Sequence, residues 1–257
     1  MGQDMCRLFA FLGTGPERLD AYLTGPAPSL RALSGAHTDG WGIARFDGGR
    51  PYVTKMERAA QDDPVFAKCV EGDRAEALIA HIRRASVGGV SHENTHPFHY
   101  GPWAFAHNGT IPGAEAAREN LLAGIPLEVR NNVKGTTDSE LAFHRILGIL
   151  EERYDTVDVP VAPALRAVGK VFRDFRREHE GSAEELAMNF LLAREEGFIA
   201  TRLNRSLYAR FGEGEFGAFT MLASEPMGLG ADGWWEIPEG HLVCVTQPGR
   251  LEIMGIP

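Results

Sequence analysis

Short apolar runs of strand length dominate the first 110 residues of the chain. Most of them end at turn residues, as at Asp47-Gly48-Gly49 and Gly88-Gly89. An apolar run of this length between turn residues is typical of a β-strand. The pattern therefore predicts strands over residues 7–12, 40–46, 51–56, 76–83 and 103–108.

The hydrophobic period changes to that of a helix in the middle of the chain. Five apolar residues share one helix face there, namely Phe143, Ile146, Leu147, Leu150 and Tyr154. Thr137 and Glu140 precede them with the spacing of a capping box, which predicts the start of this helix. A second helix is predicted over residues 161–179, with Gly181 as its stop signal.

Strand-length runs return after the two helices. They predict strands over residues 187–193, 197–203, 206–211, 218–224 and 241–246. No repeat, low-complexity segment or linker divides the chain. Strands, two helices and further strands predict a single α+β domain over residues 1–257.

Composition narrows the classes of partner and the compartment. The chain has 257 residues, 44% of them apolar, and a formal net charge of −9 with no basic segment, which argues against nucleic acid or an anionic membrane as partner. It shows no signal peptide and no apolar stretch long enough to cross a bilayer. Three widely spaced cysteines form neither a disulfide framework nor a zinc motif, so we expect a cytoplasmic protein.

Cys6, directly after Met5 at the start of the first predicted strand, allows two interpretations. A free cysteine is often a buried structural residue, and position alone favours that interpretation. If Met5 were removed, however, Cys6 would carry both a nucleophilic thiol and a free α-amine to act as its base. The reference pKa of an α-amine is about 7.7–8.0, so much of it is neutral near physiological pH.

Three other segments carry polar groups suited to acyl transfer. Asn108-Gly109 predicts a hairpin turn, but a turn at a strand end could also aim two N–H donors at one spot as an oxyanion hole. Arg83 and Arg84 end a strand and should point to opposite faces, so one of them could bind a carboxylate in a pocket. Asp138 is favoured by the helix dipole in the first turn of its helix and could equally bind an ammonium group.

Two further patterns remain ambiguous. Glycines on both sides of Trp41 fit either a loop packed over a pocket or a bulge at the start of a strand. Four histidines are close in sequence, namely His92, His96, His99 and His107. A His-x3-His spacing can bind zinc, but Pro97 breaks any helix here and no other ligand is evident, so we expect no metal site and no cofactor.

Six segments occur in the order found in class II glutamine amidotransferases, which belong to the N-terminal nucleophile (Ntn) hydrolases. They are "MCRLFAFLG", "HTDGWGIA", "HIRRAS", "NTHPF", "WAFAHNGTI" and "TDSELAF". From residue 5 to about residue 245 the chain resembles this family, in particular its small stand-alone members, which include enzymes that cut γ-glutamyl amides in thiol biosynthesis. The resemblance implies a four-layer αββα sandwich with two antiparallel sheets between helical layers.

The resemblance also implies a mechanism. Cys6 matches the nucleophile, and its own α-amine matches the general base. Asn108 and Gly109 match the oxyanion hole. The implied function is hydrolysis of glutamine or of a γ-glutamyl amide through a γ-glutamyl thioester at Cys6.

Four residues match substrate-binding positions of the family. Arg83 matches the arginine that binds the α-carboxylate, and Ser86 stands where the family often has threonine. Asp138 matches the acid that binds the α-amine, and Trp41 matches a loop that lines the glutamine pocket. His107, directly before Asn108, is the remaining substrate-binding candidate. Candidates for the pocket mouth, where the leaving amine would lie, are Arg84, His99, Trp234 and Trp235.

The first five residues depart from the family pattern. With them attached, the Cys6 nitrogen is an amide and cannot act as a base, so we expect residues 1–5 to be a leader or a misassigned start. The chain has no room for a synthase domain, which favours a hydrolase that works alone on a small-molecule substrate. Two alternatives stay open, namely a glutaminase subunit that supplies ammonia to a separate synthase and a catalytically silent binding module.

Overall fold

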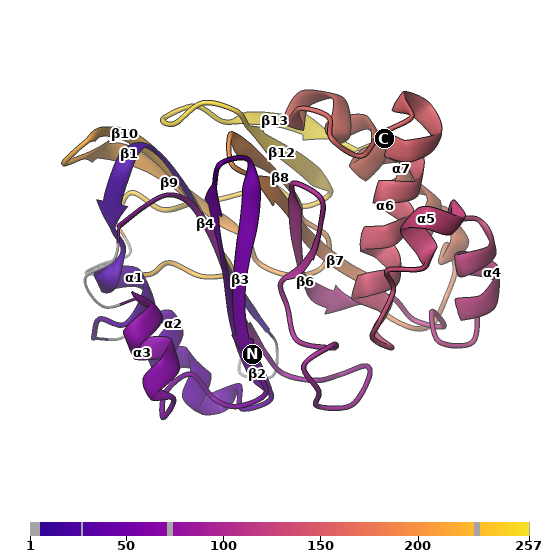
Figure 1. Cartoon of the computed structure of the whole chain (residues 1–257), viewed down its shortest axis with the longest axis horizontal. Helices are drawn as coiled ribbons and strands as arrows, with labels where there is room; N and C mark the ends of the chain where they lie inside the picture. The colour runs from indigo at the N-terminus through magenta and orange to yellow at the C-terminus, as the bar shows by residue number, and fades with distance from the viewer. Residues whose placement is uncertain (1–5, 27, 71–73, 229–231, 257) are drawn as a thin grey trace.

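The apolar runs of the sequence form two antiparallel sheets that lie face to face in the computed structural model (Figure 1). The structure describes residues 6–26, 28–70, 74–228 and 232–256. Residues 1–5, which we expect to be a leader or a misassigned start, lie outside the described residues.

The first sheet has the strand order β11-β9-β10-β1-β4-β2-β3. Its strands are β1 (Arg7–Arg18), β2 (Gly40–Asp47), β3 (Arg50–Met56), β4 (Arg74–Arg83), β9 (Tyr208–Gly214), β10 (Gly217–Ala223) and β11 (Trp235–Glu236). The N-terminal β1 lies in the middle, between β10 and β4. Residues from both ends of the chain therefore build one sheet.

The second sheet has the strand order β13-β12-β8-β7-β6-β5. Its strands are β5 (Phe98–Tyr100), β6 (Trp103–Thr110), β7 (Ala187–Arg194), β8 (Gly197–Thr201), β12 (His241–Val245) and β13 (Glu252–Gly255). β6 pairs with β7 across its whole length, from Ala104 opposite Ala193 to Thr110 opposite Ala187.

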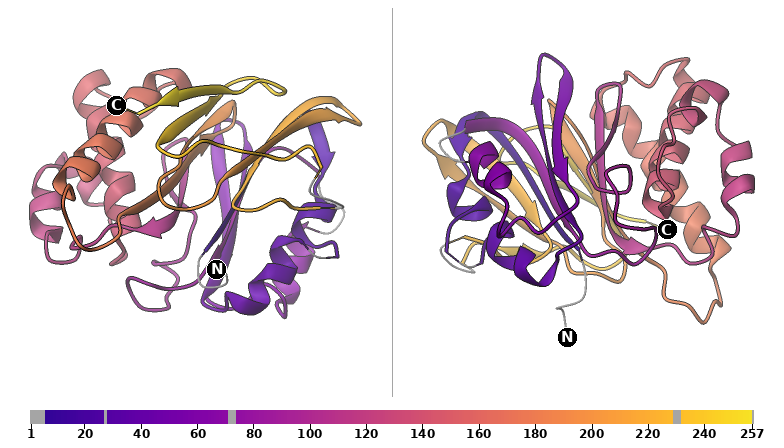
Figure 2. Two further views of the ribbon diagram at one scale, coloured as in Figure 1. Left: turned by 180° about the vertical axis from the view of Figure 1, so that it is seen from behind. Right: turned by 60° about the horizontal axis from the view of Figure 1, so that its bottom comes forward.

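Helices cover the outer face of each sheet, so the expected four-layer αββα sandwich is confirmed (Figures 1 and 2). Short helices lie on the first sheet, namely α1 (Asp20–Leu23), α2 (Leu30–Leu33), a 3-10 turn (Ser34–Ala36) and α3 (Pro64–Val70). The second sheet is covered by α4 (Arg118–Ala123), α5 (Leu127–Arg130), α6 (Asp138–Tyr154) and α7 (Val161–Glu178).

Three apolar layers separate these elements. Phe9, Trp41 and Phe66 represent the layer between the first sheet and its helices. Small and branched side chains such as Ala10 and Val243 fill the space between the sheets. The third layer, between the second sheet and α6 and α7, is rich in phenylalanine, as the stacked pair of Phe105 and Phe143 illustrates. Successive side chains of β1 and β2 point to opposite faces of the first sheet, so each strand contributes side chains to two of these layers.

Only one of the two hydrogen bonds of the predicted capping box forms at the start of α6. The Thr137 hydroxyl accepts a hydrogen bond from the Glu140 backbone N–H at 3.2 Å. The Glu140 carboxylate accepts instead from the N–H groups of Lys134 and Gly135, at 2.9 and 2.6 Å. Glu140 therefore fixes the loop that leads into the helix, and the Thr137 hydroxyl caps the first turn, in which Asp138 lies.

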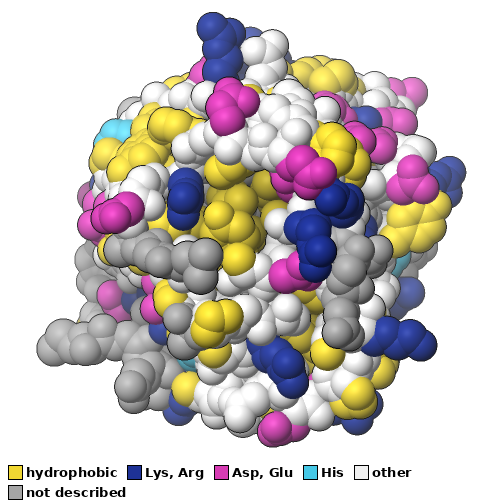
Figure 3. All heavy atoms as spheres, turned by 90° about the vertical axis from the view of Figure 1, so that its left-hand side faces the viewer, with side chains coloured by type: hydrophobic (Ala, Val, Ile, Leu, Met, Phe, Trp, Pro, Cys, Tyr) yellow, Lys and Arg dark blue, Asp and Glu magenta, His cyan; other side chains and the backbone are white. Residues whose placement is uncertain are grey.

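The surface carries charges of both signs. On the face seen from the left of Figure 1, hydrophobic side chains gather in a central hollow, with basic and acidic side chains around it (Figure 3). No helix within the described ranges combines the length and the apolar character that a membrane span requires.

Candidate active site

The pairing of β1 with β4 determines where Cys6 lies. Arg7 lies opposite Ile82 in this antiparallel pair, so the residue before β1 meets the end of β4. The Cys6 Sγ is 3.3 Å from the Arg84 backbone nitrogen and 3.3 Å from the Arg84 carbonyl oxygen. The thiol is thus fixed by backbone groups at the end of the sheet.

A small pocket opens beside this thiol, where β4, β6 and the first turn of α6 meet. Its lining consists of Cys6, Arg83, Arg84, Ser86, Val87, His96, His107, Gly109, Thr137, Asp138 and Ser139. Its volume of about 20 Å³ suits a single water molecule. Six of the eight residues that the sequence singles out, Cys6, Arg83, Ser86, His107, Gly109 and Asp138, therefore lie around one pocket.

The environment of the thiol favours its neutral form. Burial raises the pKa of Cys6, while the Arg84 N–H and the Arg83 guanidinium act in the opposite direction. Because burial has the larger effect, the thiol remains protonated at neutral pH. A base is therefore needed to activate it.

The two arginines point to opposite sides, as strand alternation predicts. Arg83 is only 3% exposed, whereas Arg84 is exposed and donates to the Ala36 carbonyl at 3.2 Å. The Arg83 guanidinium donates to the carbonyls of Val87, Gly88 and Gly89 at 3.1 to 3.3 Å. It is therefore held at the pocket by the loop that follows β4.

Asp138 and His107 are connected through Ser139. Asp138 accepts from the Ile111 N–H at 2.7 Å and from the Ser139 N–H at 2.7 Å. The His107 ring contacts the Ser139 hydroxyl through Nδ1 at 2.9 Å and the Ala187 carbonyl through Nε2 at 3.0 Å. Burial lowers the pKa of His107, so the ring is neutral. Since a carbonyl only accepts, Nε2 carries the hydrogen, and the Ser139 hydroxyl lies between Nδ1 and the Asp138 carboxylate, which is 3.1 Å from it.

Asn108 and Gly109 lie within β6 rather than in a turn, so the predicted hairpin turn is wrong. They pair with Asn189 and Met188 of β7, and the ladder continues through Thr110. A Cβ atom on Gly109 would lie 2.0 Å from the Ala187 oxygen, which leaves no room for a side chain. Gly109 lines the pocket, whereas the buried Asn108 amide donates to the Ser224 hydroxyl at 3.3 Å, on the side of the first sheet.

Trp41 lies outside the pocket, which corrects its expected place in a loop that lines the glutamine site. It belongs to β2, is fully buried, and packs edge-on against Phe66 with its Nε1 donating to Asp63 at 2.9 Å. Alternation along β2 turns Gly42 to the opposite face, where a Cβ would lie 2.1 Å from the His96 oxygen. Gly42 thus allows the pocket residue His96 to approach, and Trp41 packs in the outer core.

The remaining candidates are scattered. His99 lines a separate cavity of about 360 Å³ with Lys55 and Lys134. Trp234 donates to the Met227 carbonyl, and Trp235 packs on Phe211, so neither joins Arg84 at the pocket. No three His, Cys, Asp or Glu side chains within the described ranges are arranged to hold a metal ion.

Two histidines next to the pocket predict a loss of stability in acid. The His81 and His96 rings lie 4.4 Å apart, and both side chains are buried. Burial lowers the pKa of His81 to about 3 and that of His96 well below its ordinary value. Below about pH 6.5 these two histidines become protonated in the unfolded chain but stay neutral in the folded chain. The free energy of unfolding therefore falls as the pH decreases toward 3.

We expect each of these histidines to contribute a slope of up to about 1.4 kcal/mol per pH unit in this range. Urea denaturation at several values between pH 4 and 7 measures that slope. His81→Leu should lower the slope by up to about 1.4 kcal/mol per pH unit, the contribution of one histidine. His92→Leu, at an exposed position, should leave the slope unchanged. Equal slopes for all three proteins would contradict the assignment.

Sequence reasoning missed two serines that organise the site. Ser139 connects His107 to the first turn of α6, and its place in "TDSE" directly after Asp138 was the available signal. Ser224 accepts from both the Leu8 N–H at 2.9 Å and the Asn108 amide. It therefore connects Asn108 to the strand that begins next to Cys6, a contact between residues far apart in the sequence.

Comparisons with known proteins agree on one family. The family model for class II glutamine amidotransferases matches residues 5–222. A probable glutamine amidotransferase of Saccharomyces cerevisiae is 26% identical over 298 residues, which covers 95% of this chain and 82% of that protein. The γ-glutamyl-hercynylcysteine sulfoxide hydrolase of Mycobacterium tuberculosis is 29% identical over 257 residues, covering 95% of this chain and 94% of that one. In fold, a class II glutamine aminotransferase domain protein from Silicibacter pomeroyi superposes with a TM-score of 0.70 at 22% identity, over 98% of this chain and 99% of that one.

Proposed function

The chain belongs to the class II glutamine amidotransferases, and we propose that it hydrolyses a γ-glutamyl amide through a thioester at Cys6. The observation that carries the proposal is the pocket in which the Cys6 thiol, the Arg83 guanidinium and the Asp138 carboxylate come together. A thiol between one cation and one anion has the arrangement needed to attack the side chain of a bound α-amino acid.

The chemistry requires Cys6 to be the first residue. Its neutral α-amine then takes the thiol proton, and the thiolate attacks the γ-carbonyl carbon to form a tetrahedral intermediate. The Gly109 N–H stabilises the oxyanion, together with the N–H of the Asn108 amide that is not bonded to Ser224. The protonated α-amine returns its proton to the leaving nitrogen as the carbon–nitrogen bond breaks. Water then attacks the γ-glutamyl thioester, glutamate leaves, and the thiol is restored.

Recognition of the substrate uses the two charged side chains. Arg83 would exchange the carbonyls of residues 87–89 for the substrate α-carboxylate, a stronger, charge-assisted partner. Asp138 would bind the α-ammonium group. The pocket has room for a single water molecule, so it has to widen before a substrate enters, and Ser86 and Val87 of the loop after β4 line it. We expect Ser86, whose hydroxyl is 3.3 Å from that of Thr110, to shift as the pocket widens.

The full-length match to the mycobacterial hydrolase supports a hydrolase that acts alone. The similarity extends over nearly the whole length of both chains. That relative is named as a hydrolase of a γ-glutamyl compound, which makes γ-glutamyl amides the favoured substrates. The supply of ammonia to a separate synthase is the alternative.

A substrate panel tests the proposal. Protein that begins at Cys6 is incubated with glutamine and with γ-glutamyl amides of increasing size, and the release of glutamate is measured. We expect turnover of at least one amide, with preference for a leaving amine larger than ammonia. Turnover of glutamine alone would favour the ammonia donor. No turnover and no covalent labelling of Cys6 by diazo-oxo-norleucine would overturn the enzymatic role.

A further inference from the structure

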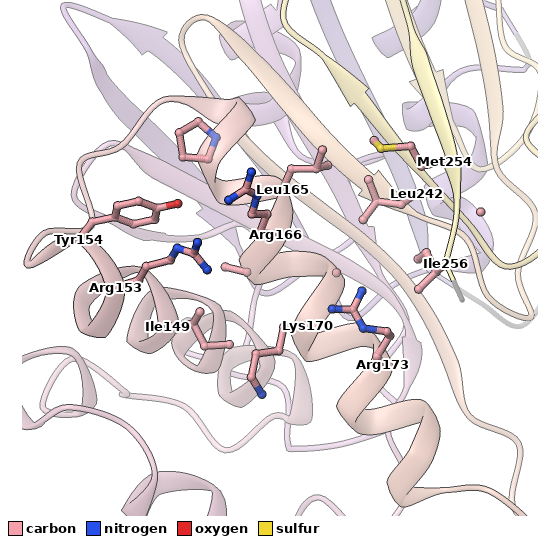
Figure 4. Close-up of a pocket in the computed structure, with 14 residues that line it drawn as sticks. Ile149, Arg153, Tyr154, Leu165, Arg166, Lys170, Arg173, Leu242, Met254 and Ile256 are labelled. Carbon is pink, nitrogen blue, oxygen red and sulfur yellow. The ribbon is translucent and has the colours of Figure 1, made fainter.

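A second hollow lies at the other end of α6, away from the Cys6 pocket (Figure 4). It has a volume of about 410 Å³ and is formed by the end of α6, by α7 and by strands β12 and β13. None of its lining residues belongs to the pocket at Cys6. The amide hydrolysis proposed at Cys6 therefore does not use this hollow.

The floor of the hollow is apolar and well fixed. Leu165, Leu242, Met254 and Ile256 line it, and Gly169 of α7 leaves the space above Leu242 open. A Cβ at Gly169 would still be 3.8 Å from the Leu242 side chain. The Ile256 N–H donates to the Gly240 carbonyl at 3.0 Å, and its carbonyl accepts from Arg176 at 3.4 Å. The wall formed by the C-terminal strand is thus already in place.

Three arginines surround this floor without a carboxylate partner among the described residues. Arg153, Arg166 and Arg173 are exposed, and none of them has a carboxylate oxygen within 4.0 Å in the described part of the chain. Arg166 and Arg173 lie two helical turns apart on one face of α7, on either side of Gly169.

Lys170, the neighbouring cation on the same helix, has a carboxylate partner. Lys170 forms an ion pair with Asp174 at 2.6 Å, and its ammonium group points away from the arginines (Figure 4). In a chain with 35 acidic and 26 basic residues, uncompensated guanidinium groups around one hollow favour an anion there.

We propose that this hollow is a binding site for a small amphiphilic carboxylate. The arginines bind the carboxylate through charge-assisted hydrogen bonds, and the hydrocarbon part lies over Leu165, Leu242 and Met254. The volume falls in the range of small-molecule pockets, about 300–1,000 Å³. A concave cavity of this size suits a single small molecule, whereas a membrane or a protein surface needs a broader contact.

Decanoate is the probe for the first test. The full chain is titrated by calorimetry with decanoate below its micelle concentration, and with butyrate and decyltrimethylammonium as comparators. We expect saturable binding of decanoate, at least tenfold tighter than that of butyrate because of the apolar floor. Weaker binding in 0.5 M salt than in 0.05 M salt is expected from the arginines. Binding of the ammonium compound as tight as that of decanoate, or no binding of decanoate at 1 mM, would overturn the proposal.

Variants at the surface identify the site without disturbing the core. Arg166→Gln combined with Arg173→Gln should weaken decanoate binding about tenfold or more, since two charged donors are lost. Met254→Glu, at a side chain that is 36% exposed, should weaken it through charge repulsion. Arg50→Gln, an exposed arginine on β3, removes one positive charge elsewhere and should change affinity less than twofold. Equal affinity in all variants would overturn the assignment to this hollow, whatever the outcome of the amide hydrolysis assays.

Discussion

Cys6→Ala, in a chain that begins at residue 6, is expected to lower the rate of amide hydrolysis by at least about 10³-fold, as loss of a catalytic nucleophile does. The physical reason is the position of the thiol, which lies at the pocket shared by Arg83 and Asp138. Initial rates of glutamate release measure the effect. Intact-mass analysis of the unaltered protein after rapid quenching should show a γ-glutamyl adduct on Cys6.

Protein that keeps residues 1–5 provides the second arm of this experiment. Its thiol is present, but its nitrogen is an amide, so the base is lost and the rate should fall about 10²- to 10⁴-fold. Burial raises the pKa of the thiol, which makes the loss of a base more severe than it would be for a thiol in water.

Cys69→Ala is the matched control for the nucleophile. It removes a partly buried thiol from the short helix α3, outside the pocket, and should leave the rate unchanged. A chain with residues 1–5 attached that hydrolyses as fast as the chain starting at Cys6 would contradict the role of the α-amine.

The sequence predicted the elements whose signals are local. α6 begins at Asp138 directly after its predicted cap and ends at Tyr154, and the long strands were found to within three residues at each end, except that β1 continues to Arg18, six residues beyond its predicted end. The helix α3, of only seven residues, and the short strands β5, β11 and β13 were missed. Such short elements contain too few residues to show a recognisable hydrophobic repeat. Packing against the rest of the protein, rather than their own sequence, stabilises them.

The sequence predicted which residues belong to the site better than it predicted positions that depend on strand pairing. Strand alternation separated Arg83 from Arg84 correctly. Asn108 and Gly109 were assigned to a turn because their local preference favours one, yet β7 pairs with them and extends the strand. Trp41 was placed in the pocket by resemblance, whereas alternation along β2 turns it toward Phe66. In both cases the deciding contact comes from a segment distant in the sequence.

Asp138→Asn is expected to lower kcat/KM for γ-glutamyl amides about 100-fold, which corresponds to about 2.7 kcal/mol of lost transition-state binding. Asparagine keeps the size of the side chain and can still accept from the Ile111 N–H, but its NH2 group cannot accept from Ser139, and it has no charge for a substrate ammonium group. The variant should therefore unfold at a lower temperature than the unaltered protein, and kcat/KM is measured at a temperature where it is fully folded.

Glu140→Gln is the matched control, because both acids lie in the first turn of α6 and both are nearly buried. Glu140 accepts from Lys134 and Gly135 and does not line the pocket, so its replacement should lower stability while kcat/KM stays near its original value.

Glutaramate, which is glutamine without its α-amine, separates recognition from structure. The unaltered protein should prefer glutamine over glutaramate by about the same 100-fold, since one charged contact is lost in each case. In Asp138→Asn that preference should largely disappear, because the ammonium group of glutamine then has no carboxylate to bind. A preference that persists in the variant would mean that Asp138 only supports the loop at Ile111, and the α-ammonium group would then need another partner.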